Sequence, residues 1–412
     1  MPGTDLKATL RLATGTRVPQ NGGGAIVMGA DYRGLGVVRS LGRRSIPVWV
    51  LRHGDHLLAA ISRYALRSLP WPNEDAESRI NFLLELSQRY GLKGWVLIPT
   101  GDETVHLVSR HRELLAKHFL LTTPAWNTLR WACDKGLMHQ LAKNLGVDQP
   151  WAACPQSRQE VIALDSPFPV ILKARLRDQP NPLSNAKAWR ADDRVSLVAL
   201  YDDACTFSPS INLMVQEVIP GRGEAQFSYA ALYKDGQPLA WATARRVRQF
   251  PMDFGRASTY VETVEVPGIV DPSERLLGAI RFTGLVEIEY KRDPRDGRFK
   301  LLDINPRVWG WHTLCAKAGV DFPGLLWSLA HGEHVARTNT RSGVRWMRMS
   351  TDLPVAIGEV QRGQLSLWSY ILVLCGPCES AIFAPDDPWP GLLELPMLAS
   401  LAVKRIFQGA RI

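Results

Sequence analysis

The sequence predicts an α/β protein that begins with an open parallel sheet. Short apolar runs alternate with helical segments over roughly the first 125 residues, and this alternation is typical of β-α-β units. Later in the chain, alternating polar and apolar residues meet at turn residues, which predicts antiparallel hairpins. At 412 residues, with 46% hydrophobic residues, the chain is long enough for two or three domains with a sizeable core.

The first predicted β-α-β unit follows a loose tail of residues 1–22. Its strands are predicted at 25–28 and 47–51, with a helix that begins near Val37. The loop Gly29–Gly36 lacks the Gly-x-Gly-x-x-Gly order of a dinucleotide site and the Gly-Lys-Ser/Thr of a Walker loop. A tight turn before a helix is therefore at least as good an interpretation as an anion site.

A helix over 77–90, a strand over 95–98 and a further helix complete an N-terminal domain that we place at residues 23–125. Asp102 follows the strand over 95–98. At the carboxyl end of a parallel strand it can face a ligand cleft, and capping of the next helix is the alternative.

Basic residues mark two elements in the middle of the chain. A helix is predicted over 134–146, and Lys135 lies in its first turn, where a cation opposes the helix dipole unless an anion lies nearby. A strand over 168–173 ends in Lys173, and another strand is predicted over 214–221. A solvated surface is the alternative explanation for Lys135.

An acidic hairpin over residues 287–307 is the most informative part of the chain. Glu289 lies on its first strand, and Asp303 and Asn305, two residues apart, lie on its second. Pairing of the strands should bring these three side chains together, with Arg307 just beyond. Oxygen ligands of this kind suit Mg²⁺ that holds phosphates. A solvated hairpin with polar outer faces is the alternative.

The hairpin, with its Asp-Pro-Arg-Asp-Gly turn and its Asp303-Ile-Asn-Pro-Arg307 end, resembles the metal-binding hairpin of the ATP-grasp superfamily. The similarity extends over roughly residues 25–335 and is greatest to the branch of predicted carboxylate–amine ligases that includes relatives of D-aspartate ligase. Asp303 stands where Glu is commoner. The resemblance implies a two-lobed ATP-grasp domain at 126–340, with a small lobe at about 150–215, and leaves 341–412 as a C-terminal accessory segment.

The resemblance also implies which residues bind ATP and Mg²⁺ (or Mn²⁺). The implied metal ligands are Glu289, Asp303 and Asn305. The implied nucleotide-binding residues are Lys135, Lys173, Lys187, Gln216, Glu217, Ile219 and Glu224. Arginines expected near the reacting groups are Arg307, Arg246 and Arg248, of which the last two alternate onto one strand face. The family's flap after the strand lysine is rich in glycine, whereas residues 174–191 contain none.

The chemistry implied is ligation of a small acid, such as an amino acid or a cell-wall precursor, to an amine or a thiol through an acyl phosphate. A kinase that shares the nucleotide site is one alternative, and a nucleotide-binding regulatory protein without catalysis is another. A dehydrogenase built on the loop at 29–36 is the least favoured.

Charge and cysteine content set wider limits. The net charge of +9 permits nucleic acid or a membrane surface, but a phosphate-bearing small substrate explains it as well, and we expect no nucleic-acid partner. No run is apolar enough to span a bilayer, so a cytoplasmic location is expected, and a homodimer is possible. Cys375-Gly-Pro-Cys378 copies a redox tetrapeptide, yet the residues after it form a poor helix, which disfavours a redox role.

Overall fold

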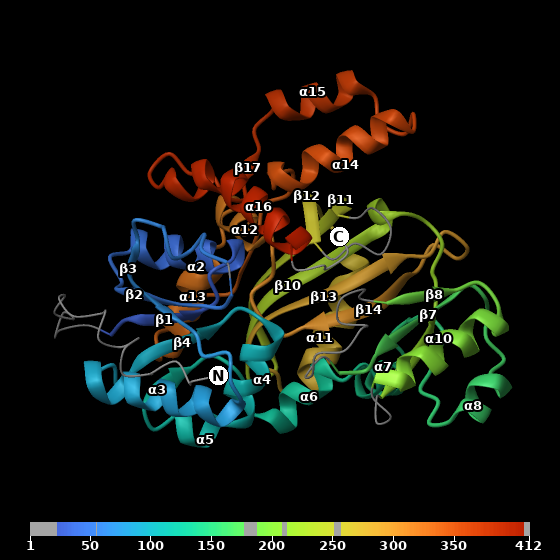
Figure 1. The fold of residues 1–412 in the computed structure, drawn as a ribbon, viewed down its shortest axis with the longest axis horizontal. Coiled ribbons are helices and arrows are strands. Elements are labelled where there is room, and N and C mark those ends of the chain that lie inside the picture. Colours follow the sequence, from blue (N-terminus) through green and yellow to red (C-terminus); the bar gives the residue numbers. More distant parts are fainter. Residues whose placement is uncertain (1–22, 55, 177–187, 208–211, 251–256, 408–412) are drawn as a thin grey trace.

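The computed structural model describes residues 23–54, 56–176, 188–207, 212–250 and 257–407, with side chains to Ala399. Figure 1 shows the N-terminal sheet at one end of the molecule and a small lobe at the other, with a large sheet between them. No helix within the described ranges has the length and apolar content needed to cross a bilayer.

The N-terminal domain is built on a five-stranded sheet with the order β3-β2-β1-β4-β5, and every pairing in it is parallel, as predicted. Its strands are β1 (Ala25–Met28), β2 (Val48–Arg52), β3 (Ala65–Pro70), β4 (Trp95–Pro99) and β5 (Phe119–Leu121). Its helices are α2 (Tyr32–Arg43), α3 (Ala76–Tyr90), α4 (Asp102–Arg110) and α5 (Arg112–Leu115). Side chains of β1 alternate, so Ala25 and Val27 pack beside α2 whereas Ile26 and Met28 pack beside α3.

Helix α2 begins five residues before the predicted start because Asp31 caps it. The Asp31 carboxylate accepts hydrogen bonds from the backbone N–H groups of Arg33 and Gly34. The glycines of this loop are explained by close packing: a Cβ at Gly34 would lie 2.1 Å from the carbonyl oxygen of Gly29. The turn interpretation therefore accounts for the loop without a ligand.

The small lobe is a four-stranded sheet with the order β6-β9-β7-β8. Its strands are β6 (Ala152–Ala153), β7 (Val170–Ala174), β8 (Trp189–Ala191) and β9 (Leu213–Glu217). Two helices, α8 (Arg158–Ala163) and α10 (Arg194–Phe207), pack on it and complete a separate core. Two further helices precede the lobe, α6 (Trp126–Cys133) and α7 (Lys135–Asn144), and α7 is followed by Gly146 with a φ of 64°, as the glycine stop predicted.

The large sheet runs in the order β14-β13-β10-β11-β12-β16-β17, and β15 pairs with β11. Its strands are β10 (Gln226–Lys234), β11 (Gln237–Phe250), β12 (Ala257–Thr263), β13 (Gly284–Arg292), β14 (Phe299–Asn305), β15 (Thr338–Asn339), β16 (Arg345–Met347) and β17 (Glu379–Ser380). Helix α11 (Pro267–Ala279) packs on one face together with α6 and α7. On the opposite face, residues of the sheet and of the N-terminal domain share one continuous core, which also includes helices α12 (His312–Lys317) and α13 (Phe322–Ala330).

The C-terminal segment is joined to both neighbouring parts of the molecule. The boundary that we placed at 340/341 falls between β15 and β16, two strands of the same large sheet. Helices α14 (Met349–Gln361), α15 (Leu367–Cys375) and α16 (Trp389–Phe407) form the rest of the segment.

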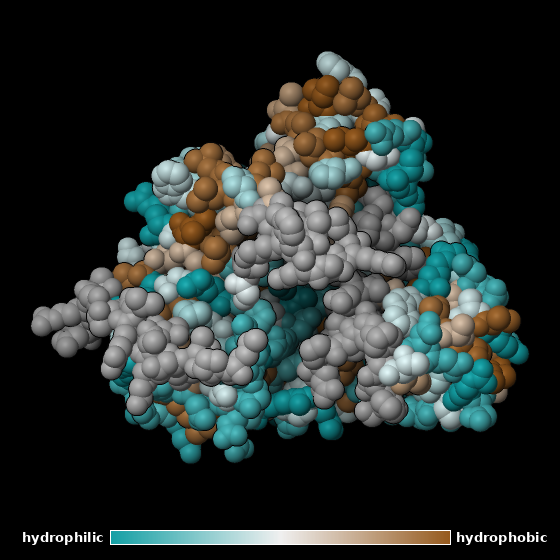
Figure 2. Space-filling model, in the orientation of Figure 1, coloured by the Kyte–Doolittle hydropathy of each residue, from teal (hydrophilic) through white to brown (hydrophobic). Residues whose placement is uncertain are grey.

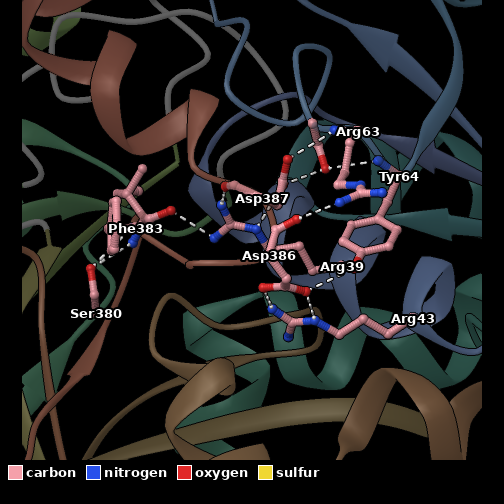
Figure 3. Close-up of polar contacts among 10 residues, drawn as sticks. Arg39, Arg43, Arg63, Tyr64, Ser380, Phe383, Asp386 and Asp387 are labelled. Atoms are coloured by element: carbon pink, nitrogen blue, oxygen red, sulfur yellow. Dashed lines mark hydrogen bonds and ion pairs between the residues drawn. The ribbon is translucent and has the colours of Figure 1, made fainter.

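Two consecutive aspartates fasten this segment to the N-terminal domain (Figure 3). The buried Asp387 carboxylate accepts hydrogen bonds from Arg39, 2.9 Å away, from the Ser62 hydroxyl and from the backbone N–H of Arg63. The half-exposed Asp386 accepts two from Arg43, each at 2.8 Å, and one from the Tyr64 hydroxyl. The chain thus closes on itself over a separation of more than 300 residues.

Candidate active site

The hairpin β13–β14 pairs in an antiparallel ladder. Glu289 lies opposite Asp303, and Glu287 lies opposite Asn305. A bulge follows this pair, because Tyr290 lies opposite Leu301 and leaves Leu302 without a partner.

This bulge reverses the alternation within β14. Leu301 and Ile304 both reach the buried core beneath the sheet, although they are three residues apart. Asp303 is thereby turned to the opposite face, beside Glu289. Without the extra residue, Asp303 would point into the core alongside Leu301.

The three predicted metal ligands lie together on this face. The Asn305 side-chain amide donates a hydrogen bond of 3.1 Å to Glu289, and the two carboxylates are cross-strand neighbours. Within the described residues, no group of three or more His, Cys, Asp or Glu side chains is placed to hold a metal. Two carboxylates and an amide nevertheless fit Mg²⁺, which is usually bound by one or two carboxylates and takes its other ligands from phosphates and water.

Two predicted cations balance these carboxylates. Lys135 Nζ lies 2.7 Å from Asp303 Oδ1, and Arg246 Nη2 lies 3.4 Å from Glu289 Oε1. All four side chains are buried. The cluster therefore joins the predicted metal ligands to groups expected to bind the phosphates or the substrate carboxylate.

Arg246 is held in place from two further sides. Its guanidinium donates hydrogen bonds of 2.8 Å to Gln226 and 3.1 Å to Gln249. Its buried Nε has no hydrogen-bond partner among the described residues. A buried N–H without an acceptor carries a desolvation cost that an anionic ligand oxygen would relieve.

Arg248 lies in a different environment from Arg246, despite the spacing that suggested a common anion. Its guanidinium forms two hydrogen bonds with Asp352 of α14, at 2.9 and 2.8 Å, and lies over the rings of Tyr260 and Tyr370. The ladder is irregular between the two arginines, and Asp352, more than 100 residues away, already provides the anion. The structure therefore does not bring Arg248 into contact with the carboxylate cluster.

Glu287, two residues before Glu289, is a buried carboxylate beside the cluster. Its carboxylate accepts hydrogen bonds from the Trp311 indole at 2.8 Å and from the Ser228 hydroxyl at 3.0 Å. Burial, and then the neighbouring Glu289 charge, raise the pKa of Glu287 above its ordinary value.

Arg307 connects the hairpin with the N-terminal domain. Its Nε donates a hydrogen bond to the carboxylate of Asp102, the first residue of α4. The N-cap of α4 is Gly101, so Asp102 faces the cleft rather than capping the helix. Both domains line a pocket here, formed by Asp102, Val105, His106, Cys133, Lys135, Asp303, Ile304, Asn305 and Pro306.

Comparison with known proteins agrees with this arrangement. Residues 211–351 match a family described as ATP-grasp in the biosynthetic pathway with Ter operon. The chain is 23% identical over 303 residues to D-aspartate ligase of Enterococcus faecium, a match that covers 68% of this chain and 70% of that protein. Two solved structures share the fold at 15% identity. L-amino acid ligase from Bacillus licheniformis has a TM-score of 0.58 over 76% of this chain and 75% of its own. Biotin carboxylase from Campylobacter jejuni has a TM-score of 0.60 over 75% and 71%.

The chain has the ATP-grasp fold. The resemblance seen in the hairpin and the predicted α/β class are both confirmed.

The predicted nucleotide-binding residues of this ATP-grasp domain lie on and around the small lobe. Lys173 is buried on the face of β7 opposite to the lobe's core, and burial together with the Lys173 charge lowers the pKa of His139. Gln216 and Ile219 are buried, and Glu224 is exposed in a short 3-10 turn, Gly223–Ala225. Lys187 lies outside the described residues, as does most of the glycine-free segment before it.

Glu217, predicted at the adenine edge, makes contacts that the sequence did not reveal. One oxygen accepts a hydrogen bond from the backbone N–H of Trp151 at 3.2 Å, and the other lies 2.6 Å from Arg295. Arg295 belongs to the turn of the hairpin β13–β14, where it also pairs with Asp293. Lys291 of the same hairpin donates to the Gly221 carbonyl. The hairpin turn is thus fastened to the strand that leads out of the small lobe.

The cysteine pair is not arranged as in a redox site. Cys375 ends α15 rather than preceding a helix, and both cysteines are free. Burial, followed by the charges of Asp352 and Glu379, raises the pKa of Cys378 to about 11, whereas a reactive thiol needs a lowered value.

Proposed function

We propose that the chain is an ATP- and Mg²⁺-dependent carboxylate–amine ligase that joins a small-molecule acid to an amine through an acyl phosphate. The observation that supports it best is the buried cluster in which Glu289, Asp303 and Asn305 meet Lys135 and Arg246. Lys135, Asp303 and Asn305 of this cluster line a pocket shared with the N-terminal domain, so the proposed nucleotide and acceptor sides would adjoin.

In the proposed first step, an oxygen of the substrate carboxylate attacks the γ-phosphorus of ATP, and the bond from that phosphorus to the bridging oxygen of ADP breaks. Lys135 and Lys173 would offset the phosphate charge, because phosphoryl transfer depends on positioning and electrostatic stabilisation more than on a protein nucleophile. Glu289, Asp303 and Asn305 would hold Mg²⁺, which neutralises phosphate charge when bound.

In the second step, the amine nitrogen attacks the acyl carbon, inorganic phosphate leaves, and the nitrogen releases a proton. Negative charge develops on the acyl oxygen in between. Arg307, oriented by Asp102, and Arg246, with its unpartnered Nε, are the groups proposed to stabilise it. Arg248 would act less directly, because Asp352 already holds it.

An amino acid is the proposed acid, since the curated relative is a D-aspartate ligase and a structural neighbour is an L-amino acid ligase. The test is a screen of amino acids as acid and amine, with Mg²⁺ or Mn²⁺, for ADP release together with product mass. The proposal expects equal amounts of ADP, phosphate and amide. A phosphorylated acid that accumulates without phosphate release would instead identify a kinase.

The metal assignment is tested by Glu289→Gln, with Asp296→Asn in the exposed hairpin turn as the matched control. Loss of ADP release in the first variant alone, with unchanged thermal unfolding in both, is expected. Full activity of Glu289→Gln would overturn the assignment.

A further inference from the structure

We propose that the C-terminal helices α14, α15 and α16 bind the surface of an anionic lipid bilayer. They carry most of the large apolar side chains that the described part of the chain exposes. These are Met349, Leu353, Ile357, Leu367, Trp368, Ile371, Leu372, Leu374, Trp389, Leu392, Leu393 and Leu395. Figure 2 shows apolar side chains over the α14–α15 projection and over the neighbouring part of the C-terminal segment.

The exposed residues follow helical faces rather than being scattered. On α14, Met349, Leu353 and Ile357 are spaced by four residues and form one stripe. On α15, Trp368 and Leu372 are likewise four apart, and they are 67% and 55% exposed. Exposed apolar side chains grouped along helix faces in this way mark an interaction site.

Helix α15 contains no charged residue in the run Leu367–Cys375. Its contacts with the rest of the protein include Tyr370, which is buried in a small cluster with Tyr260 and Ala356, and Val373, which packs against that cluster. Both exposed tryptophans lie in the first turn of their helix. Trp at the margin of an apolar face is typical of side chains that settle at a lipid–water interface.

Arginines offset the acids of α14 and α16, so these helices do not oppose an anionic surface. Each acid on α14 and α16 that the structure describes is paired with arginine: Asp352 with Arg248, Glu359 with Arg222 and Arg362, and Glu394 with Arg348. The aspartates before α16 are paired with Arg39 and Arg43. Each of these five carboxylates therefore has an arginine partner, which reduces its repulsion from lipid phosphate.

The net charge of the chain also favours an anionic surface. The whole chain carries +9, and a strongly positive protein is attracted to acidic headgroups. Two copies of the chain, each strongly positive, would repel one another instead, which favours lipid over a second copy as the occupant.

The test is co-sedimentation of the full chain with phosphatidylcholine vesicles, with and without phosphatidylglycerol. Binding is expected to be stronger with phosphatidylglycerol and to weaken with added salt. The double variant Trp368→Ser, Leu372→Ser is expected to reduce partitioning about tenfold or more, since each 1.4 kcal/mol lost is a factor of ten. Val195→Ser is the matched control, because Val195 is 81% exposed on α10, away from the C-terminal helices.

Light scattering of the vesicle-free protein distinguishes the other occupants. A dimer that the double variant dissociates, without vesicle binding by the parent chain, would show that a second copy covers this face and would overturn the proposal. Absence of both vesicle binding and self-association would overturn it as well. Unchanged thermal unfolding of the double variant would show that its fold is intact.

Discussion

Lys135 Nζ and Asp303 Oδ1 lie 2.7 Å apart, although 168 residues separate them. Lys135 is the first residue of helix α7, just before the small lobe, and Asp303 lies on the second strand of the hairpin β13–β14. In the proposed function, one is a phosphate ligand and the other a metal ligand. Each neutralises the other at the point where nucleotide and metal are expected to meet, so their pairing links the two binding events.

Replacement of Asp303 by Asn is expected to weaken Mg²⁺ binding about 10- to 100-fold or more, because an anionic ligand is lost and Lys135 is left unbalanced. The measurement is ADP release as a function of Mg²⁺ concentration. Asp296→Asn, on the exposed turn of the same hairpin, is the control. An unchanged Mg²⁺ requirement in Asp303→Asn would contradict the assignment.

Replacement of Asp102 by Asn is expected to lower kcat about tenfold, with little change in the KM for ATP. Asn keeps a hydrogen bond to Arg307 but removes the charge that orients it, and neither residue lies on the strands of the small lobe. Steady-state kinetics checks this. Glu103→Gln, the next residue on α4, is the control, and a rise in KM for ATP with kcat unchanged would refute the role proposed for Arg307.

Glu287 is expected to make stability depend on pH. Its folded-state pKa is raised from 4.5, first by burial and then by Glu289, so between the two values the folded chain binds more protons than the unfolded chain. Stability therefore falls as pH rises through this window. Glu287→Gln should unfold at a higher temperature than the parent chain at neutral pH, and the difference should vanish near pH ~4.

Thermal unfolding across pH, without Mg²⁺, is the measurement for Glu287→Gln. Glu265→Gln is the control because Glu265 is exposed. A Glu287 variant that is less stable than the parent at neutral pH would contradict the prediction, because it would show that the fold favours the charged carboxylate.

Asp387→Asn is expected to destabilise the chain by about 3 kcal/mol, because it leaves Arg39 buried beside a neutral partner. The neighbouring Asp386→Asn should cost less than about 1 kcal/mol, since the Asp386–Arg43 pair is half-exposed. Urea unfolding of both variants measures the difference. Equal losses of unfolding free energy in the two variants would mean that burial does not determine how strongly each ion pair stabilises the fold.

The sequence predicted most of what depends on local pattern. Alternation and turn residues were sufficient to predict the hairpin that carries Glu289 and Asp303, because strand pairing across a short turn leaves few registers. Edge strands such as β3 were missed because their burial is partial and their alternation is weak. The bulge at Leu302 was also missed, since a single unpaired residue leaves no periodic trace.

Long-range contacts account for the rest. Arg246 and Arg248 look equivalent along the strand, and only the distant Asp352 separates their environments. The same applies to Arg295, which reads as a turn residue until Glu217 is brought beside it. Asp386 and Asp387 form ion pairs with Arg43 and Arg39, which lie near the other end of the chain. Such pairs are decided by tertiary packing, which no local pattern encodes.

The clamp formed by Asp386 and Asp387 also limits how the protein can move (Figure 3). The N-terminal domain already shares a core with the large sheet, and the clamp ties the returning C-terminal segment to the same body. The small lobe has a core of its own, and the contacts of Glu217 with Arg295 and of Lys291 with Gly221 tie it to the hairpin. In the proposed function, closure of this lobe over a ligand would strain these contacts, whereas Asp102 and Arg307 would keep their positions on the acceptor side.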